Sequence, residues 1–120
     1  ENFGNYRAIG YIHEMELAYA ACDFVICRAG AVTCAELAAV GLPALLVPLP
    51  IGNGEQIENA RDLMATGAAQ MIANQDFTSE WVARNIFEIL NNAPARFKGI
   101  SKRADEVIGM KALELIRLSK

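Results

Sequence analysis

Residues 23–41 read DFVICRAGAVTCAELAAVG, and this stretch decides the expected fold. Residues 23–27 form an apolar run after a polar start, which is typical of a strand buried on both faces of a parallel sheet. Gly30 then opens a turn, and residues 33–40 form a helix of small residues that stops at Gly41, its expected C-cap. The order of strand, turn and helix predicts one unit of an α/β fold.

The same alternation continues on both sides of this unit. Further strands are expected at residues 7–12, 43–47 and 69–72. Further helices are expected at residues 15–21, 55–66 and 79–90, and one or two more after residue 94. Thr78 is the expected N-cap of the helix at 79–90, whose apolar stripe is Val82, Ile86, Ile89 and Leu90. The predicted fold class is α/β, a Rossmann-like parallel sheet with flanking helices, short enough to leave one edge uncovered.

Composition narrows the classes of function. The chain has 120 residues, of which 53% are hydrophobic and 21% charged, so it can bury a core. A formal net charge of −3 and the lack of a basic run argue against nucleic acid as a partner. The longest apolar stretch, residues 38–51, is broken by Gly and Pro and is shorter than the roughly 20 residues that span a bilayer. The chain opens on Glu1 in mid-pattern, which favours a piece of a longer protein.

Cysteine and histidine are the candidate reactive side chains. Cys22, Cys27 and Cys34 are spaced as in no known zinc or redox motif, so we interpret them as buried thiols in a reducing compartment. His13 is of the residue type that most often serves as a general base, yet we interpret it as an exposed loop residue. No metal site, cofactor or catalytic residue is predicted in this chain.

The turn at Gly30 is the first candidate ligand site. In parallel sheets, ligands bind beyond the carboxyl ends of the strands, and a helix N-terminus there suits an anion such as a diphosphate. Gly30 lets the backbone approach a ligand, Thr33 can cap the helix and offer a hydroxyl, and Glu36 can reach ribose hydroxyls. Thr33 and Glu36 fit equally well a capping box, S/T-x-x-E, with no ligand. Both interpretations stay open on pattern alone.

A second candidate loop follows the next strand, at residues 48–60, PLPIGNGEQIENA. Glu55, Gln56 and Asn59 lie on one flank of a helix start there, at the same edge of the predicted sheet. Their carboxylate and amides suit the neutral hydroxyls of a hexose. Without a ligand they are simply a polar helix N-terminus, and the pattern does not decide between the two.

Together these motifs resemble a known family. The chain is similar to glycosyltransferase family 28, and within it to the MurG family of peptidoglycan synthesis. The resemblance rests on DxVICRAGAxT at residues 23–33, ELAAxGLPA at 36–44, PLP at 48–50 and QxxNA at 56–60, with YIHEM at 11–15 before them. It covers nearly the whole chain, although after about residue 77 it is a likeness of helical pattern more than of motif.

The resemblance implies a two-domain GT-B enzyme. Such an enzyme moves N-acetylglucosamine from UDP-N-acetylglucosamine, with inversion, to the C4 hydroxyl of the undecaprenyl-diphosphate-linked muramoyl-pentapeptide, converting lipid I into lipid II. Residues 1–120 would be the C-terminal part of its donor-binding domain. The N-terminal acceptor domain, absent here, would bind lipid I and contact the cytoplasmic face of the bacterial plasma membrane peripherally. The 120-residue chain alone is expected to bind UDP weakly and to be inactive.

The resemblance also assigns roles within the donor site. The backbone of Ile12 would contact the uracil, Glu36 the ribose hydroxyls, and Gln56 the sugar hydroxyls with help from Glu55 and Asn59. Arg28 would shape the site, offer charge or form a salt bridge. The diphosphate would be lined by Gly30, Ala31, Val32 and Thr33, followed by Cys34 and Ala35. Two other readings stay open: a GT-B enzyme of diacylglycerol or natural-product type, and the donor-binding subunit of a split glycosyltransferase.

Overall fold

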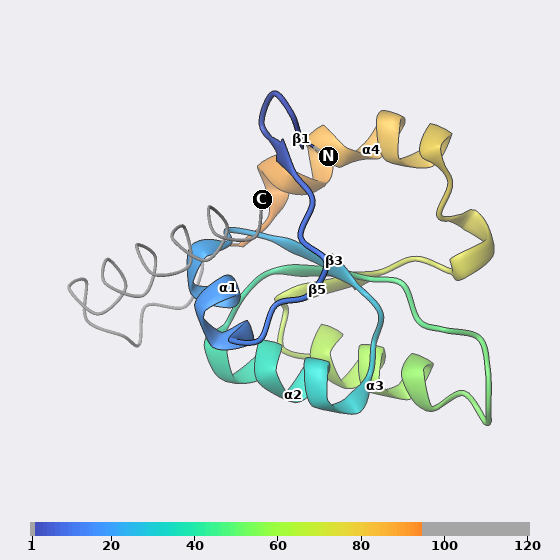
Figure 1. The fold of residues 1–120 in the computed structure, drawn as a ribbon. Coiled ribbons are helices and arrows are strands. Elements are labelled where there is room, and N and C mark those ends of the chain that lie inside the picture. The colour runs from blue at the N-terminus through green and yellow to red at the C-terminus, as the bar shows by residue number, and fades with distance from the viewer. Residues whose placement is uncertain (1, 95–120) are drawn as a thin grey trace. The chain divides into compact units, whose positions relative to one another are not determined.

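The computed structural model describes residues 2–94, with side chains from residue 4 onward (Figure 1). The helices expected after residue 94 lie outside the described residues. The described chain divides into two compact units, the first ending at Cys22 and the second beginning at Asp23. Among residues 2–94, no helix is long and apolar enough to cross a bilayer.

The first unit contains a small hairpin and one helix. Strands β1 (Asn2–Phe3) and β2 (Tyr6–Arg7) pair antiparallel, and helix α1 (Met15–Ala21) follows after a loop. The predicted helix at residues 15–21 is therefore confirmed. The predicted strand at residues 7–12 is wrong, because only Arg7 belongs to a strand. The residues that follow Arg7 are mostly exposed and include a glycine, which weakens a strand with no neighbour to pair with.

The second unit is built on a three-stranded parallel sheet in the order β3-β4-β5. Its strands are β3 (Val25–Cys27), β4 (Ala44–Leu46) and β5 (Ala69–Met71), with Ile26 opposite Leu45 and Leu45 opposite Gln70. Its helices are α2 (Ala31–Val40), α3 (Glu55–Met64), the short η1 (Asn74–Asp76) and α4 (Ser79–Asn92). The predicted α/β class is confirmed, with strand ends one or two residues shorter than expected.

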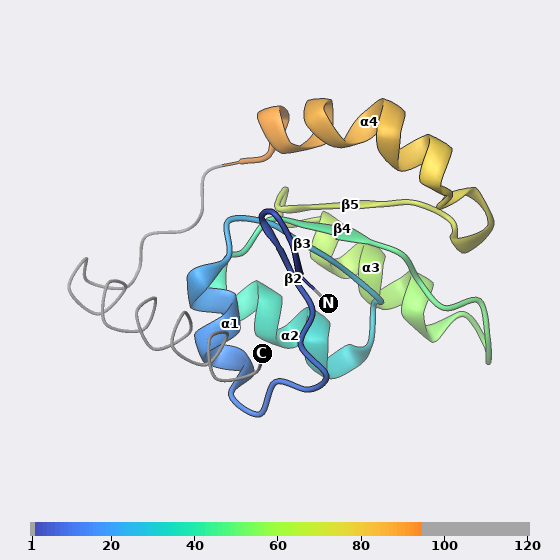
Figure 2. The same cartoon turned by 45° about the horizontal axis from the view of Figure 1, so that its top comes forward.

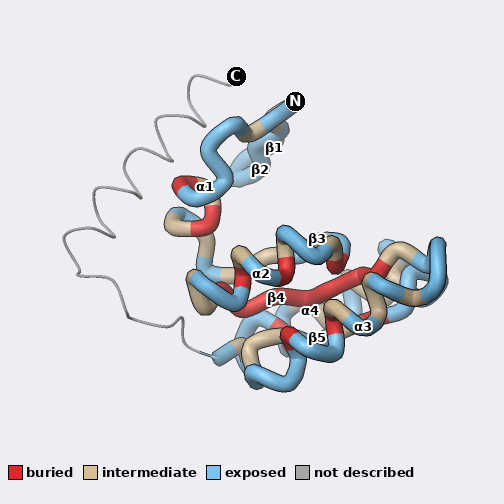
Figure 3. Tube along the Cα trace, turned by 90° about the horizontal axis from the view of Figure 1, so that it is seen from below, coloured by how far each residue is buried: buried red, intermediate tan, exposed pale blue. Residues whose placement is uncertain are grey.

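Helices cover both faces of this sheet. The crossover helices α2 and α3 lie together on one face, and α4 lies on the other (Figures 1 and 2). Strand β4 is buried along its whole length, as the red segment in Figure 3 shows. Leu45 packs with Val47, Ile72 and Ile89, so it faces α4. Because strand side chains alternate between faces, Leu46 and Ala44 face α2 and α3.

Strand β3 is less buried than its sequence predicts. The side chain of Ile26 is 40% exposed, although an apolar run of this kind is typical of a strand buried on both faces. Within the described residues, β3 pairs with β4 alone, and the core under α4 is built on β4 and β5. The prediction of full burial is therefore wrong for this strand, whereas the predicted uncovered edge is confirmed.

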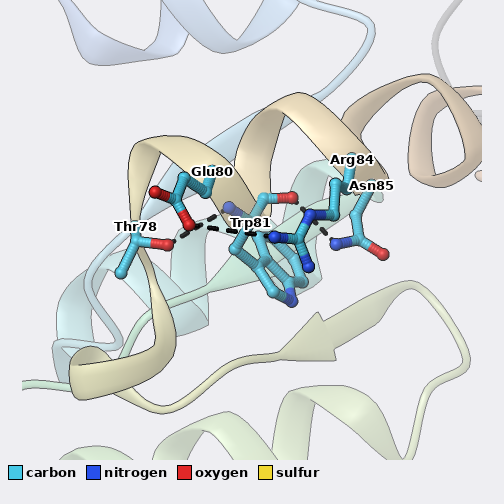
Figure 4. Close-up of polar contacts among 5 residues, drawn as sticks. All are labelled: Thr78, Glu80, Trp81, Arg84 and Asn85. Carbon is cyan, nitrogen blue, oxygen red and sulfur yellow. Dashed lines mark hydrogen bonds and ion pairs between the residues drawn. The ribbon is translucent and has the colours of Figure 1, made fainter.

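The structure corrects the predicted start of one helix and confirms two predicted capping residues. Helix α2 begins at Ala31 with Gly30 as N-cap, two residues earlier than expected, so Thr33 is not the cap. Gly41 ends the helix as predicted, in the left-handed conformation (φ 68°), and its N–H donates to the Leu37 carbonyl. Thr78 caps α4 as predicted, because its Oγ1 accepts the Trp81 N–H at 3.1 Å (Figure 4).

The apolar stripe predicted for α4 is right except at its end. Ile89 is buried and Val82 and Ile86 are half-buried, but Leu90 is 45% exposed. Trp81, which the predicted stripe did not include, is half-buried and packs against the core beside Phe77. The side of α4 that packs against the core therefore begins at Trp81 and ends at Ile89, not at Leu90.

Candidate functional site

The loops after β3 and β4 meet at the carboxyl edge of the sheet. Ala29, which is fully buried, lies between them, and side chains of α3 bind both of its backbone polar groups. Gln56 Oε1 accepts the Ala29 N–H at 3.2 Å, and Asn59 Nδ2 donates to the Ala29 carbonyl at 3.0 Å. The two motifs that the sequence placed at one edge are therefore in direct contact.

Gln56 also holds the loop after β4. Its Oε1 accepts a second backbone N–H, from Leu49, at 2.8 Å. All the hydrogen bonds that the Gln56 side chain makes within residues 2–94 therefore use its oxygen. The Nε2 group is left to donate to a ligand, which limits Gln56 to partners that accept, such as a hydroxyl or phosphate oxygen.

The N-terminus of α2 is open to a ligand. Gly30 supplies no side-chain cap, and the N–H groups of the first helical turn have no partner inside the helix. Val32, in that turn, is 72% exposed. Thr33 stands third in the helix, so the capping box that its spacing to Glu36 suggested is not formed. The helix therefore presents unpaired N–H donors and its positive end at the edge of the sheet.

Glu36 lies in the second turn of α2 and is half-buried. Within the described residues, its carboxylate makes no ion pair and accepts no hydrogen bond. Ala31 and Ala35 are exposed on the same helix. Cys34 is different, because its side chain is buried and its N–H donates to the Gly30 carbonyl at 2.9 Å. Cys34 therefore offers a ligand neither its thiol nor its backbone donor.

Arg28 connects the ends of all three parallel strands. Its Nη1 donates to the Val47 carbonyl, just after β4, at 3.2 Å, and to Asn74 Oδ1, after β5, at 2.6 Å. Both partners are neutral, so the salt bridge considered for Arg28 is not formed. Sequence reasoning missed Asn74. The available signal was its position, since it is the first polar side chain after β5 at the edge already singled out.

Glu55 is folded back on its own loop. Its Oε2 accepts the Asn53 N–H at 3.0 Å. The same oxygen lies 2.6 Å from the position that a Cβ on Gly52 would take, and Gly52 has a φ of +71°. The loop thus holds the Glu55 carboxylate, which is not directed at a ligand in this conformation.

Two cysteines flank the turn at Gly30. Burial, and to a lesser extent the neighbouring Cys34, raise the pKa of Cys27 from 9.0 to about 11. Burial, followed by the charge of Asp62, raises the pKa of Cys34. Neither thiol forms a disulfide. Both are uncharged at neutral pH and unsuited to act as nucleophiles, although only Cys34 is buried as fully as predicted.

Ile12 and His13 belong to the first unit. Ile12 is half-buried, and its predicted contact with the uracil stays a prediction. His13 is exposed in a loop, as predicted, and its ring packs edge-on against Tyr11 with centroids 4.7 Å apart. Within residues 2–94, no three His, Cys, Asp or Glu side chains gather in a way that could hold a metal ion.

The family follows from a comparison with known proteins. Residues 1–113 match the Glycosyltransferase family 28 C-terminal domain. The chain therefore belongs to this family. A crystal structure of MurG from Acinetobacter baumannii has the same fold, with a TM-score of 0.61 and 28% identity, and the match covers 91% of this chain and 33% of that one.

Similar proteins include enzymes named UDP-N-acetylglucosamine--N-acetylmuramyl-(pentapeptide) pyrophosphoryl-undecaprenol N-acetylglucosamine transferase. The one from Mycobacterium bovis is 51% identical over 102 residues, which are 85% of this chain and 25% of that protein. The one from Thermobifida fusca is 49% identical over 87 residues, 72% of this chain and 23% of that protein. The chain thus spans about a quarter of the length of the curated relatives it matches.

Proposed function

We propose that this chain supplies the donor-binding part of an enzyme that transfers N-acetylglucosamine from UDP-N-acetylglucosamine to lipid I, giving lipid II for peptidoglycan. The observation that carries the proposal is the open N-terminus of α2 beside the unpaired carboxylate of Glu36 and the donor group of Gln56. These groups suit, respectively, the diphosphate, the ribose and the sugar of the donor. The names of the relatives support the same reaction.

The proposed roles follow from the chemistry of each group. The N–H groups of Ala31, Val32 and Thr33 would bind the diphosphate. As the glycosidic bond breaks, negative charge grows on the leaving UDP, and fixed N–H dipoles would stabilise it. Glu36 would accept hydrogen bonds from the ribose hydroxyls, and Gln56 Nε2 would donate to a sugar oxygen. The uracil would meet the backbone of Ile12.

The rest of the reaction is assigned to other parts of a larger enzyme. Residues 1–120 would be the C-terminal part of its donor-binding domain, and lipid I would bind to an N-terminal domain. That domain would make the peripheral contact with the cytoplasmic face of the plasma membrane. Through lipid II, the enzyme would serve cell-wall growth, and with it cell shape and division. The catalytic base would also lie outside this chain.

A titration with the donor tests the proposal. We expect the chain to bind UDP-N-acetylglucosamine weakly, and Glu36→Ala to weaken this binding by about 10- to 150-fold, the value of one hydrogen bond to a charged group. Glu80→Ala is the matched control, because Glu80 is exposed at the start of α4, on the other face of the sheet. Equal affinity in the wild type and in Glu36→Ala would contradict the ribose assignment.

A competition experiment separates this function from that of another GT-B enzyme. UDP-glucose lacks the acetamido group of UDP-N-acetylglucosamine but shares its nucleotide and diphosphate. We expect UDP-N-acetylglucosamine to displace a labelled UDP more effectively than UDP-glucose does. The reverse preference would favour a glucosyltransferase of the diacylglycerol or natural-product type.

A further inference from the structure

We propose that Asn59 is a positioning residue for the diphosphate-binding turn and not primarily a ligand of the sugar. It would act together with the oxygen of Gln56, through the backbone of Ala29. The inference rests on the proposed function, because it assigns this work to residues of the same site. It differs from the role expected for Asn59 on resemblance, which is to help Gln56 hold sugar hydroxyls.

The contacts of Ala29 carry the inference. Ala29 is fully buried and directly precedes Gly30, the N-cap of α2. Its N–H and its carbonyl are held by side chains 27 and 30 residues further along the chain. Buried backbone groups are strongly disfavoured without a partner. Two side chains of α3 therefore fix the orientation of the peptide groups on both sides of Ala29.

The course of the chain into α2 depends on these contacts. Gly30 has no side chain to cap the helix, and a Cβ added to it would meet only the Thr33 hydroxyl, at 4.0 Å. The direction of the first N–H groups of α2 is thus set by the residue before Gly30. Asn59 and Gln56 would align these donors with the diphosphate before it binds, which lowers the cost of ordering them.

The two side chains have different groups left over. One N–H of Asn59 Nδ2 donates to the Ala29 carbonyl, which fixes the amide against the turn and leaves its second N–H and its Oδ1 unused by the turn. Gln56 has the opposite arrangement, with its oxygen committed and its amide donor available. Both side chains therefore position the turn, and a comparison of nucleotides with and without the sugar separates positioning by Asn59 from contact with the sugar.

Comparing UDP with UDP-N-acetylglucosamine tests this division, because UDP has no sugar. We expect Asn59→Ala to weaken the binding of both nucleotides to the 120-residue chain by the same factor, about three- to tenfold. The variant is neutral, so it brings no charge near the diphosphate. Asn91→Ala, the same change at an exposed position of α4, serves as the control and should alter neither affinity. Weaker binding of UDP-N-acetylglucosamine with unchanged binding of UDP would overturn the inference.

A measurement without ligand keeps the inference separate from the proposed function. Amide hydrogen exchange, followed by NMR, should be about tenfold faster at Ala29 in Asn59→Ala than in the wild type. The reason is that freeing the Ala29 carbonyl lets the turn open and exposes the Ala29 N–H, which in the wild type donates to Gln56. Amides of β5 should keep their wild-type rates, which shows that the chain is folded. If Asn59→Ala does not fold, Asn59→Ser replaces it. Unchanged exchange at Ala29 would overturn the positioning role, whether or not the chain binds a nucleotide. A wild-type chain that binds neither UDP nor UDP-N-acetylglucosamine would instead count against the proposed function.

Discussion

Arg28 shows how one side chain can join three strands. Its guanidinium reaches the carbonyl of Val47 and the side chain of Asn74, which are far apart in the sequence. Both bonds are donated by one nitrogen, Nη1, which the long side chain places between the two loops. Of the roles considered for Arg28, which were to shape the site, to offer charge or to form a salt bridge, these two bonds fit the first, because they hold the edge on which the candidate site lies.

A double-mutant cycle measures this link. We expect Asn74→Ala to lower the free energy of unfolding by about 1.5 kcal/mol, the low end for a hydrogen bond to a charged group, because the pair is exposed. Arg28→Ala should lower it by more, because it also removes the bond to the Val47 carbonyl. The double variant should lose less than the sum of the two. Urea unfolding of the four proteins gives the coupling. Strictly additive losses would mean that the 2.6 Å contact does not contribute to stability.

The thiol of Cys27 gives a prediction with a defined pH range. The folded protein holds its pKa near 11, above the ordinary value of 9.0, so the unfolded chain loses this proton first as the pH rises. The contribution of Cys27 to stability is therefore full below pH 9.0 and declines as the pH rises to about 11.

Alkylation at pH 8 checks the same shift. Because only the thiolate reacts, Cys27 should be alkylated by iodoacetamide about 100-fold more slowly in the folded chain than in urea, on the basis of its thiolate fraction. Peptide mapping by mass spectrometry follows each cysteine separately. Equal rates in the folded and unfolded chains would show that the thiol is not shielded.

At the scale of elements, helix α4 contains two interactions whose contributions to stability should differ, an N-cap and an exposed ion pair. Thr78 Oγ1 accepts the Trp81 N–H, whereas Glu80 and Arg84 form an exposed pair 3.8 Å apart (Figure 4). We expect Thr78→Ala to lower the free energy of unfolding by about 1 kcal/mol, since an N-cap satisfies an otherwise unpaired donor. Arg84→Ala should cost less, because water already screens the exposed pair.

Urea unfolding decides the order of the two effects. Thr78→Ser is the conservative control, and it should retain most of the wild-type stability because it keeps the hydroxyl. A larger loss in Arg84→Ala than in Thr78→Ala would contradict the assignment of Thr78 as the residue that anchors the start of α4.

At the scale of the whole molecule, we expect the 120-residue chain to bind the nucleotide without transferring the sugar. We expect UDP to raise the midpoint of thermal unfolding of the 120-residue chain, since a ligand that binds only the folded state stabilises it. We also expect no lipid II from this chain when it is mixed with donor and lipid I, because the acceptor and the base are assigned to other parts. Lipid II formation, followed by chromatography of the lipid fraction, would contradict that division.

Local sequence patterns correctly predicted much of the fold. Helix α1 has the predicted bounds, Gly41 and Thr78 have the predicted capping roles, and β4 is the predicted buried strand. These features depend on residues within one turn of each other or on a continuous apolar run. The strand expected at residues 7–12 and the full burial of β3 were wrong, because both require a neighbouring element that sequence does not reveal.

By itself, the sequence determined the alternation of strands and helices, the family, and the edge of the sheet where polar loops meet. Only the tertiary structure decided how those loops are joined. Arg28 donates to Asn74, which is 46 residues away in the sequence. Gln56 and Asn59 bind the backbone of Ala29, from which they are 27 and 30 residues away. No local spacing encodes such contacts, since they form only when parallel strands bring their carboxyl ends side by side. The physical reason is that a buried backbone group must find a partner wherever the packed chain places one.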